Sequence, residues 1–160
     1  MVSGPRIAET LCQLGVTDVV WLPDSLLGTW ETALAAEPRL RLLRVCREGE
    51  AWALAAGLLI GGRRPLVVVQ CTGLFESGDA LRNVLFDWRL PLWALVGYRS
   101  YLLAGSTDTA RRFTEPVLAA WGLDTLLVES DDGLQRLAAF FRSCQAGGRA
   151  GVGLIAEGRG

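Results

Sequence analysis

One carboxylate stands out as a group that could do chemistry. Glu48 lies in residues 46–62, CREGEAWALAAGLLIGG, where a short charged cluster precedes an almost wholly apolar helical stretch that ends in paired glycines. No residue of 51–60 is charged, so we expect most of this helix to be buried. The chain contains no histidine, which excludes Ser-His and Cys-His nucleophiles. A glutamate at the mouth of an apolar helix is therefore the leading candidate for chemistry.

The elements that must position this glutamate alternate along the chain. Short apolar runs with β-branched residues are typical of buried parallel strands, and they are separated by helical patterns. This alternation predicts a single domain over residues 1–160, an α/β fold with a three-layer, doubly wound, mostly parallel six-stranded sheet and helices on both faces. The expected strands are 18–22, 39–45, 65–70, 91–96, 124–128 and 152–155, and the expected helices are 4–14, 26–36, 48–61, 77–88, 110–121 and 133–146.

Ligands of such sheets bind beyond the carboxyl ends of the strands, where the strand order reverses. Four segments meet this description: residues 23–25, 47–48, 70–73 and 97–100. Asp24 and Ser25 are also good helix N-caps, so a structural role is equally open to them. Cys71 follows a strand within a predicted loop, where a thiol can be reactive.

Composition narrows the function classes. The chain is 51% hydrophobic with a net charge of −1, which disfavours nucleic-acid binding and points to a protein partner for the excess apolar surface. No apolar run is long enough to span a membrane, and the first residues lack a signal-peptide pattern, so we expect a cytoplasmic protein. The four cysteines are far apart, which leaves zinc without a ligand set, and neither common glycine-rich phosphate motif is present.

Several motifs together resemble a known family. Residues 47–57, R-E-G-E-A-W-A-L-A-A-G, follow a strand and separate a glutamate from a glycine by nine positions with small residues between them. This pattern resembles the pyrimidine-binding (Pyr) domain of thiamine-diphosphate-dependent 2-oxo acid decarboxylases, most closely sulfopyruvate decarboxylase α-subunits and the equivalent half of phosphonopyruvate decarboxylase. Residues 22–25 (LPDS), 70–74 (QCTGL), 89–92 (RLPL), 97–99 (GYR) and 114–118 (TEPVL) are similar to the family's other motifs, so the resemblance covers nearly the whole chain.

The resemblance implies roles for particular residues. It assigns Glu48 to the family glutamate that hydrogen-bonds N1′ of the aminopyrimidine and promotes the tautomer that deprotonates the thiazolium C2; Glu50 is the competing assignment. It further implies substrate contacts at Asp24, Ser25, Gln70 and Arg99, and cofactor contacts at Glu48, Cys71, Thr72 and Gly73.

The chain departs from the family pattern in one loop and supplies only half of a site. Phe75 and Glu76 stand where relatives carry small and amide residues, which puts an anionic sulfonate or phosphonate substrate in doubt. The family's metal-binding GDG-to-Asn motif is absent, and Asp131-Asp132-Gly133 is only a weak substitute. The resemblance therefore implies a second polypeptide that holds the diphosphate and Mg²⁺, with self-association to a heterotetramer or larger.

We accordingly expect the Pyr subunit of a two-chain decarboxylase that acts on a small 2-oxo acid and is inactive without its partner. An acyloin-forming carboligase subunit shares every feature above. A non-catalytic interaction or regulatory domain of the same fold is the rival from another class, and the altered loop at Phe75 and Glu76 favours it.

Overall fold

The computed structural model describes residues 1–22, 24 and 27–158. Its centre is one six-stranded sheet in the order β2-β1-β3-β4-β6-β5, in which every neighbouring pair is parallel. The order reverses between β1 and β3, because β2 lies on one side of β1 and β3 on the other. The strands are β1 (Asp18–Trp21), β2 (Arg41–Arg44), β3 (Pro65–Gln70), β4 (Trp93–Tyr98), β5 (Thr125–Val128) and β6 (Gly151–Ala156).

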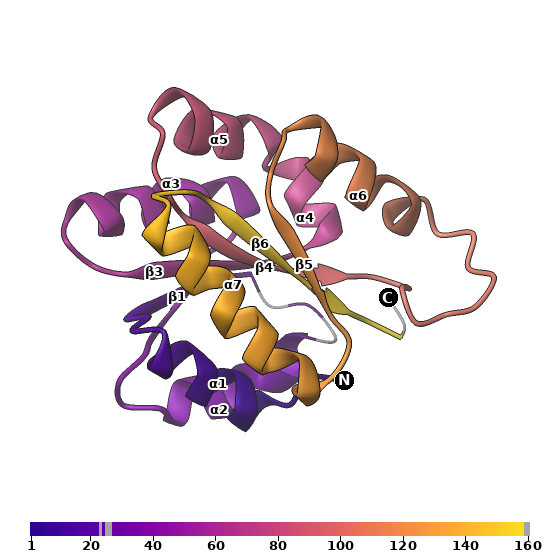
Figure 1. The fold of residues 1–160 in the computed structure, drawn as a ribbon, viewed down its shortest axis with the longest axis horizontal. Helices are drawn as coiled ribbons and strands as arrows, with labels where there is room; N and C mark the ends of the chain where they lie inside the picture. Colours follow the sequence, from indigo (N-terminus) through magenta and orange to yellow (C-terminus); the bar gives the residue numbers. More distant parts are fainter. Residues whose placement is uncertain (23, 25–26, 159–160) are drawn as a thin grey trace.

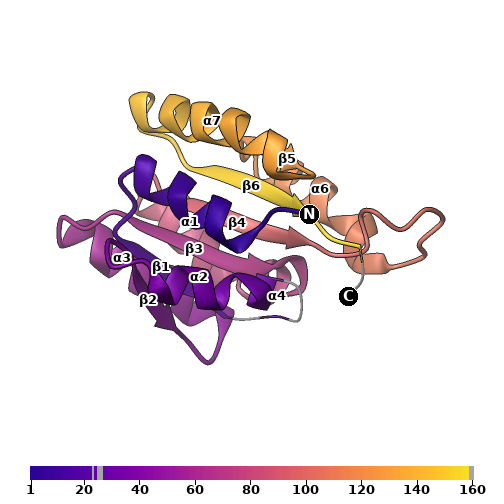
Figure 2. The same cartoon turned by 90° about the horizontal axis from the view of Figure 1, so that it is seen from below.

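Helices cover both faces of this sheet, as Figure 1 and Figure 2 show. One apolar core includes Leu11, Leu34 and Phe141 and lies under α1, α2 and α7, and the other includes Trp52 and Leu118 and lies under α3 to α6. The predicted three-layer α/β fold is thus confirmed. The first layer contains α1 (Gly4–Gln13), η1 (Leu27–Trp30), α2 (Glu31–Ala36) and α7 (Leu134–Ala146), preceded by the turn η3 (Asp131–Gly133); the second contains α3 (Glu48–Ile60), α4 (Cys71–Glu76), α5 (Gly78–Arg82), η2 (Asn83–Asp87) and α6 (Thr109–Ala120).

The connection after β3 differs from the sequence prediction. Residues 71–73 were expected to form a loop, but α4 begins at Cys71, directly after the last residue of β3. The predicted helix over 77–88 is divided into α5 and the π-helical turn η2, and β4 begins at Trp93 rather than at residue 91. Leu90 donates its backbone N–H to Val84 O and Leu92 donates to Leu90 O, so residues 90–92 form a turn that delays the strand.

Helix α3 has a buried face and an exposed face, although both are apolar. Ala51, Trp52, Ala55 and Ala56 are fully buried, which fits the expected apolar packing. The opposite face, Ala53, Leu54, Gly57 and Ile60, is exposed, with Leu54 at 39% and Ile60 at 69%. The expectation that most of α3 is buried is therefore wrong for this chain by itself, because the helix lies on the outside of the sheet.

No helix in the described ranges is long and apolar enough to cross a membrane.

Candidate active site

The two competing glutamates at the start of α3 have different surroundings. Glu50 Oε2 accepts the backbone N–H groups of Cys46 and Arg47, at 3.1 and 3.2 Å, and so caps the helix. Glu48 is the first residue of the helix and is half-buried. Within the described ranges its carboxylate has no hydrogen-bond or ion-pair partner. Local capping therefore occupies Glu50 and leaves Glu48 available.

The carboxylate of Glu48 lies against the backbone of α4. A Cβ atom added at Gly73 would be only 2.7 Å from Glu48 Cδ, so any larger residue at position 73 would displace the carboxylate. Trp52 holds the two helices together, since its Nε1 donates to Ser77 Oγ at 2.9 Å and Ser77 Oγ donates to Gly73 O at 2.7 Å. This buried link fixes the distance between Glu48 and Gly73.

The end of β3 presents an amide beside this contact. Gln70 is the last residue of β3, and Thr72 Oγ1 donates to its Oε1 at 3.0 Å. Thr72 is exposed, whereas the Cys71 side chain is fully buried. Burial raises the pKa of the Cys71 thiol, which disfavours the reactive thiolate. A contact of Cys71 with a ligand would have to come from its backbone.

The remaining substrate candidates lie near the same edge. Asp24 follows β1, and its Oδ1 accepts the backbone N–H of Leu27 at 2.7 Å, so it does cap η1. Ser25 lies outside the described residues. Arg99 follows β4 at the base of the loop that projects from the sheet in Figure 1, and its Nε lies 2.8 Å from Asp108 Oδ2. Arg99 therefore already has an anionic partner within the chain.

A buried carboxyl group that the sequence analysis did not identify lies among these residues. Glu157 directly follows β6 and is 2% exposed. Gln70 Nε2 donates to its Oε2 at 3.5 Å. Burial and the neighbouring Asp24 carboxylate raise the pKa of Glu157 to about 8, despite opposing effects of Gln70 and Arg99. The rule applied to the other strands, a polar residue just past a carboxyl end, would have identified it.

The two residues that depart from the family pattern have defined contacts. Glu76 Oε1 accepts a hydrogen bond from Arg47 Nη2 at 2.8 Å, and its Oε2 accepts the Gly49 N–H at 3.3 Å. The Arg47 pairing lowers the pKa of Glu76, so it is a charged part of the α3 N-terminus. Phe75 contributes to an open pocket of about 560 Å³ between α4 and α6, together with Thr72, Thr109, Ala110, Phe113, Val117 and Trp121.

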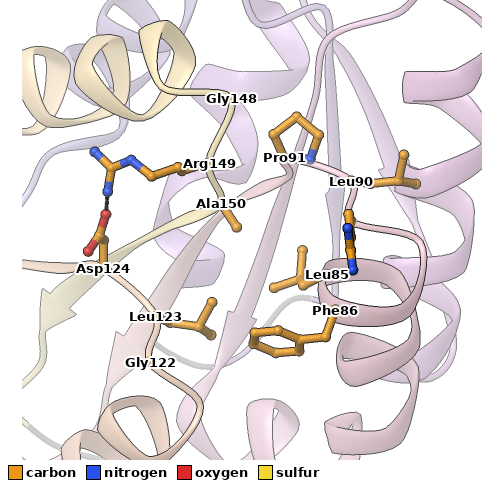
Figure 3. Close-up of a pocket in the computed structure, with 11 residues that line it drawn as sticks. Leu85, Phe86, Leu90, Pro91, Gly122, Leu123, Asp124, Gly148, Arg149 and Ala150 are labelled. Carbon is orange, nitrogen blue, oxygen red and sulfur yellow. Dashed lines mark ion pairs between the residues drawn. The ribbon is translucent and has the colours of Figure 1, made fainter.

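Another cavity, of about 260 Å³, lies at the other end of the strands, near the amino ends of β4, β5 and β6. Figure 3 shows its lining from the segments that precede β4, β5 and β6, with Arg149 and Asp124 forming an ion pair. None of the predicted site residues lines it, because their segments lie at the carboxyl ends of the strands.

The acidic string at residues 131–133 has a structural contact. Asp131 accepts hydrogen bonds from the backbone N and Oγ of Ser3, at 2.7 and 2.8 Å, which ties η3 to the start of α1. Across the described ranges, no group of three or more His, Cys, Asp or Glu side chains is arranged to hold a metal ion.

Comparisons with known proteins identify decarboxylases and a synthase as relatives of this chain. No protein-family model matches the sequence. The chain is 32% identical over 99 residues to phosphonopyruvate decarboxylase of Streptomyces viridochromogenes, a match that spans 62% of this chain and 25% of the relative. It is 29% identical over 144 residues to 2-succinyl-5-enolpyruvyl-6-hydroxy-3-cyclohexene-1-carboxylate synthase of Geobacillus kaustophilus, spanning 86% of this chain and 24% of the relative.

A third match is to a protein named as a subunit. The chain is 24% identical over 102 residues to sulfopyruvate decarboxylase subunit alpha of Methanococcus maripaludis, spanning 64% of this chain and 61% of the relative. The chain thus spans about a quarter of the length of the first two relatives and somewhat more than half of the third. These matches, together with the parallel α/β fold, confirm the resemblance of the chain to the pyrimidine-binding domains of thiamine-diphosphate-dependent enzymes.

Proposed function

We propose that this chain is the pyrimidine-binding subunit of a thiamine-diphosphate-dependent decarboxylase that acts on a small 2-oxo acid of the sulfopyruvate or phosphonopyruvate type. The observation that carries the proposal is the carboxylate of Glu48. It lies at the carboxyl edge of the sheet and is half-buried, and no described residue occupies it, while neighbouring Glu50 caps the helix.

The surroundings of Glu48 fit the pyrimidine end of the cofactor. Gly73 leaves room for the carboxylate beside α4, and the Trp52–Ser77–Gly73 link holds it there. Thiamine diphosphate supplies carbanion stabilisation for 2-oxo acid chemistry when bound. Glu48 would hold a proton against a ring nitrogen through its free carboxylate, and the backbone of residues 71–73 would contact the ring. Gln70 and Asp24 would face the substrate.

The proposal includes a second polypeptide that holds the diphosphate and Mg²⁺. The name of the relative from Methanococcus maripaludis contains the word subunit, and the longer relatives extend well beyond the matched segment. The exposed face of α3 carries Ala53, Leu54, Gly57 and Ile60 and no charge among them, which suits burial in an oligomer. We propose that this face and the partner together produce a heterotetramer or larger assembly, inactive as the single chain.

Replacing Glu48 by Gln tests the proposal. Loss of a group that transfers or shares a proton in the transition state lowers turnover by about 100- to 10,000-fold. We expect a loss of this size for Glu48→Gln, measured as decarboxylation of pyruvate, sulfopyruvate and phosphonopyruvate by the chain reconstituted with a partner that carries a diphosphate-binding motif.

The matched control is Glu50→Gln, because Glu50 lies two residues further along the same turn of α3. It should retain most of the turnover, because Glu50 serves the cap and the amide oxygen of a glutamine can accept the same two backbone N–H groups. Near-normal turnover by Glu48→Gln, or an equal loss in the two variants, would contradict the assigned role.

Two specific observations favour second candidates. The synthase relative matches 86% of this chain, which favours an acyloin-forming carboligase; analysis of the products formed from pyruvate with an added aldehyde distinguishes it from the decarboxylase. Phe75 and Glu76 favour a non-catalytic interaction domain. Calorimetry with thiamine diphosphate and Mg²⁺ distinguishes this domain from the decarboxylase subunit, because a non-catalytic domain should bind no cofactor with any partner.

A further inference from the structure

The position of Glu157 is fixed by its backbone. Its N–H donates to Tyr98 O at 3.1 Å, and its carbonyl accepts the N–H of Leu102 at 2.9 Å. The side chain is thereby directed to the carboxyl ends of β3 and β4, where Oε1 lies so close to Gly97 that a Cβ there would collide with it. The absence of a side chain at Gly97 creates the space that this carboxyl group fills.

Among the described residues, Glu157 has no direct cationic partner. The described charged or titratable groups that act on it are Asp24 after β1, Cys71 of α4, and Arg99 after β4. The Arg99 guanidinium pairs with Asp108 instead. Glu157 Oε1 is buried and has no hydrogen-bond partner within the described ranges.

The donors to the Glu157 carboxyl group differ from those to buried Asp18. Asp18 accepts hydrogen bonds from two arginines, at 2.6 and 2.9 Å, whereas the only described donor to the Glu157 side chain is the neutral Gln70 amide, at 3.5 Å. The lack of a charged donor in the described ranges favours the neutral form of Glu157. Burial next to Asp24 acts in the same direction and raises the pKa of Glu157 to about 8.

A chain of contacts joins this acid to the proposed site. Glu157 accepts from the Gln70 amide, whose oxygen accepts from Thr72 in α4. Gly73, the next residue of α4, lies against Glu48. The two carboxyl groups thus flank residues 70–73, one on the α3 side and the other at β6.

We propose that Glu157 is a positioning residue that carries a proton at neutral pH, orients the Gln70 amide toward the carboxylate of a 2-oxo acid, and opposes binding of that anion once it ionises. The inference rests on the proposed function for its substrate class. The second N–H of the Gln70 amide is the donor available to the substrate, because the first is used by Glu157. An ionised Glu157 would add a second negative charge beside Asp24 and repel the substrate.

The pH dependence of KM for pyruvate, measured with the reconstituted complex between pH 6 and 9.5, tests the proposal. We expect KM to rise through about pH 8, by up to about tenfold per pH unit above it, with a smaller change in kcat. Glu157→Gln keeps an acceptor for Gln70 but cannot ionise, so the alkaline rise in KM should disappear. The matched control is Glu129→Gln, an exposed glutamate just after β5, which should keep the rise.

A second measurement is independent of turnover. In the chain with ¹³C-labelled glutamate side chains, one carboxyl resonance should titrate near pH 8 and be missing in Glu157→Gln. The proposal is overturned if no such resonance exists, or if an active Glu157→Gln complex keeps the alkaline rise in KM. If the resonance titrates as expected but no 2-oxo acid is turned over or bound, the proposed function fails and the substrate role of Glu157 fails with it.

Discussion

Asp18 and Glu157 are two buried carboxyl groups of one sheet, the first at the amino end of a strand and the second just past the carboxyl end of another. They differ in how their charge is compensated. Asp18 begins β1 and is fully buried, and Arg41 Nε and Arg63 Nε lie 2.6 and 2.9 Å from its two oxygens. Glu157 follows β6, and in the part of the chain that the structure describes its carboxyl group accepts a hydrogen bond only from the amide of Gln70, at 3.5 Å. A buried carboxylate with two arginines is a structural charge, whereas one without a direct cation is adapted to hold a proton.

The pKa values of the two groups move in opposite directions for this reason. Burial alone would raise the pKa of Asp18, but hydrogen bonds from Arg63, Thr17 and Arg41 together outweigh it and lower the pKa. Burial and Asp24 raise the pKa of Glu157. Asp18 therefore stabilises the fold above its ordinary pKa, and this contribution is lost as the pH falls through the folded value. Glu157 contributes most below its ordinary pKa, and its contribution is lost as the pH rises to about 8.

The largest expected change in stability comes from replacing Glu157 by a residue that cannot ionise. Between its ordinary pKa of 4.5 and about 8, the unfolded chain releases a proton that the folded chain keeps, so stability falls with rising pH. Glu157→Gln should therefore be more stable than the parent chain at pH 8 by about 3–5 kcal/mol, with little difference at pH 4.5. Urea denaturation of the isolated chain across this range measures the effect. A difference that does not depend on pH would mean that Glu157 is ionised in the folded chain.

Breaking the compensated carboxylate should have the next largest effect. Asp18→Asn loses charge-assisted hydrogen bonds and should destabilise the chain at pH 7 by about 2–3 kcal/mol. The loss stays moderate because the Arg41 and Arg63 side chains are 53% and 46% exposed and can turn into water. The same urea denaturation measures it.

The control for Asp18 is Asp79→Asn. Asp79 also pairs with an arginine, Arg82, but its side chain is 83% exposed. Exposed ion pairs contribute little, so this variant should remain close to the parent chain. Equal losses in the two variants would remove the distinction between buried and exposed pairs.

The smallest effect comes from filling the space beside Glu157. Gly97→Ala places a Cβ against Glu157 Oε1 and should cost about 1–2 kcal/mol through overpacking. The cost should largely vanish when Glu157 is also replaced by alanine, and a double-mutant cycle at pH 5 measures this coupling. Gly57→Ala is the matched control, because a Cβ there meets nothing within 4 Å and should favour helix α3. Additive costs at Gly97 and Glu157 would show that the two positions are independent.

Much of the fold could be predicted from local patterns. Apolar runs such as PLVVVQ in β3 predict buried parallel strands. The paired glycines correctly predict the end of α3, and Gly62 has a positive φ of 79°. The start of α4 at Cys71 was missed because Cys-Thr-Gly is a weak helix-forming sequence, and packing on β3 and β4 overrides that preference. The division of the helix over 77–88 was also missed.

The features of the candidate site likewise divide into those that local sequence predicts and those that depend on the tertiary structure. By itself the sequence determined the class of fold and the edge of the sheet where Glu48, Asp24, Gln70 and Arg99 lie. These depend on residues close together in the chain, because the periodicity that predicts strands and helices is local. Only the tertiary structure decided that Arg99 is paired with Asp108 and that Glu157 is buried beside Gln70 and Asp24, which raises its pKa to about 8. Burial and neighbouring charge determine a protonation state, and for Glu157 they come from β1, β3 and β4, distant segments that only folding brings together.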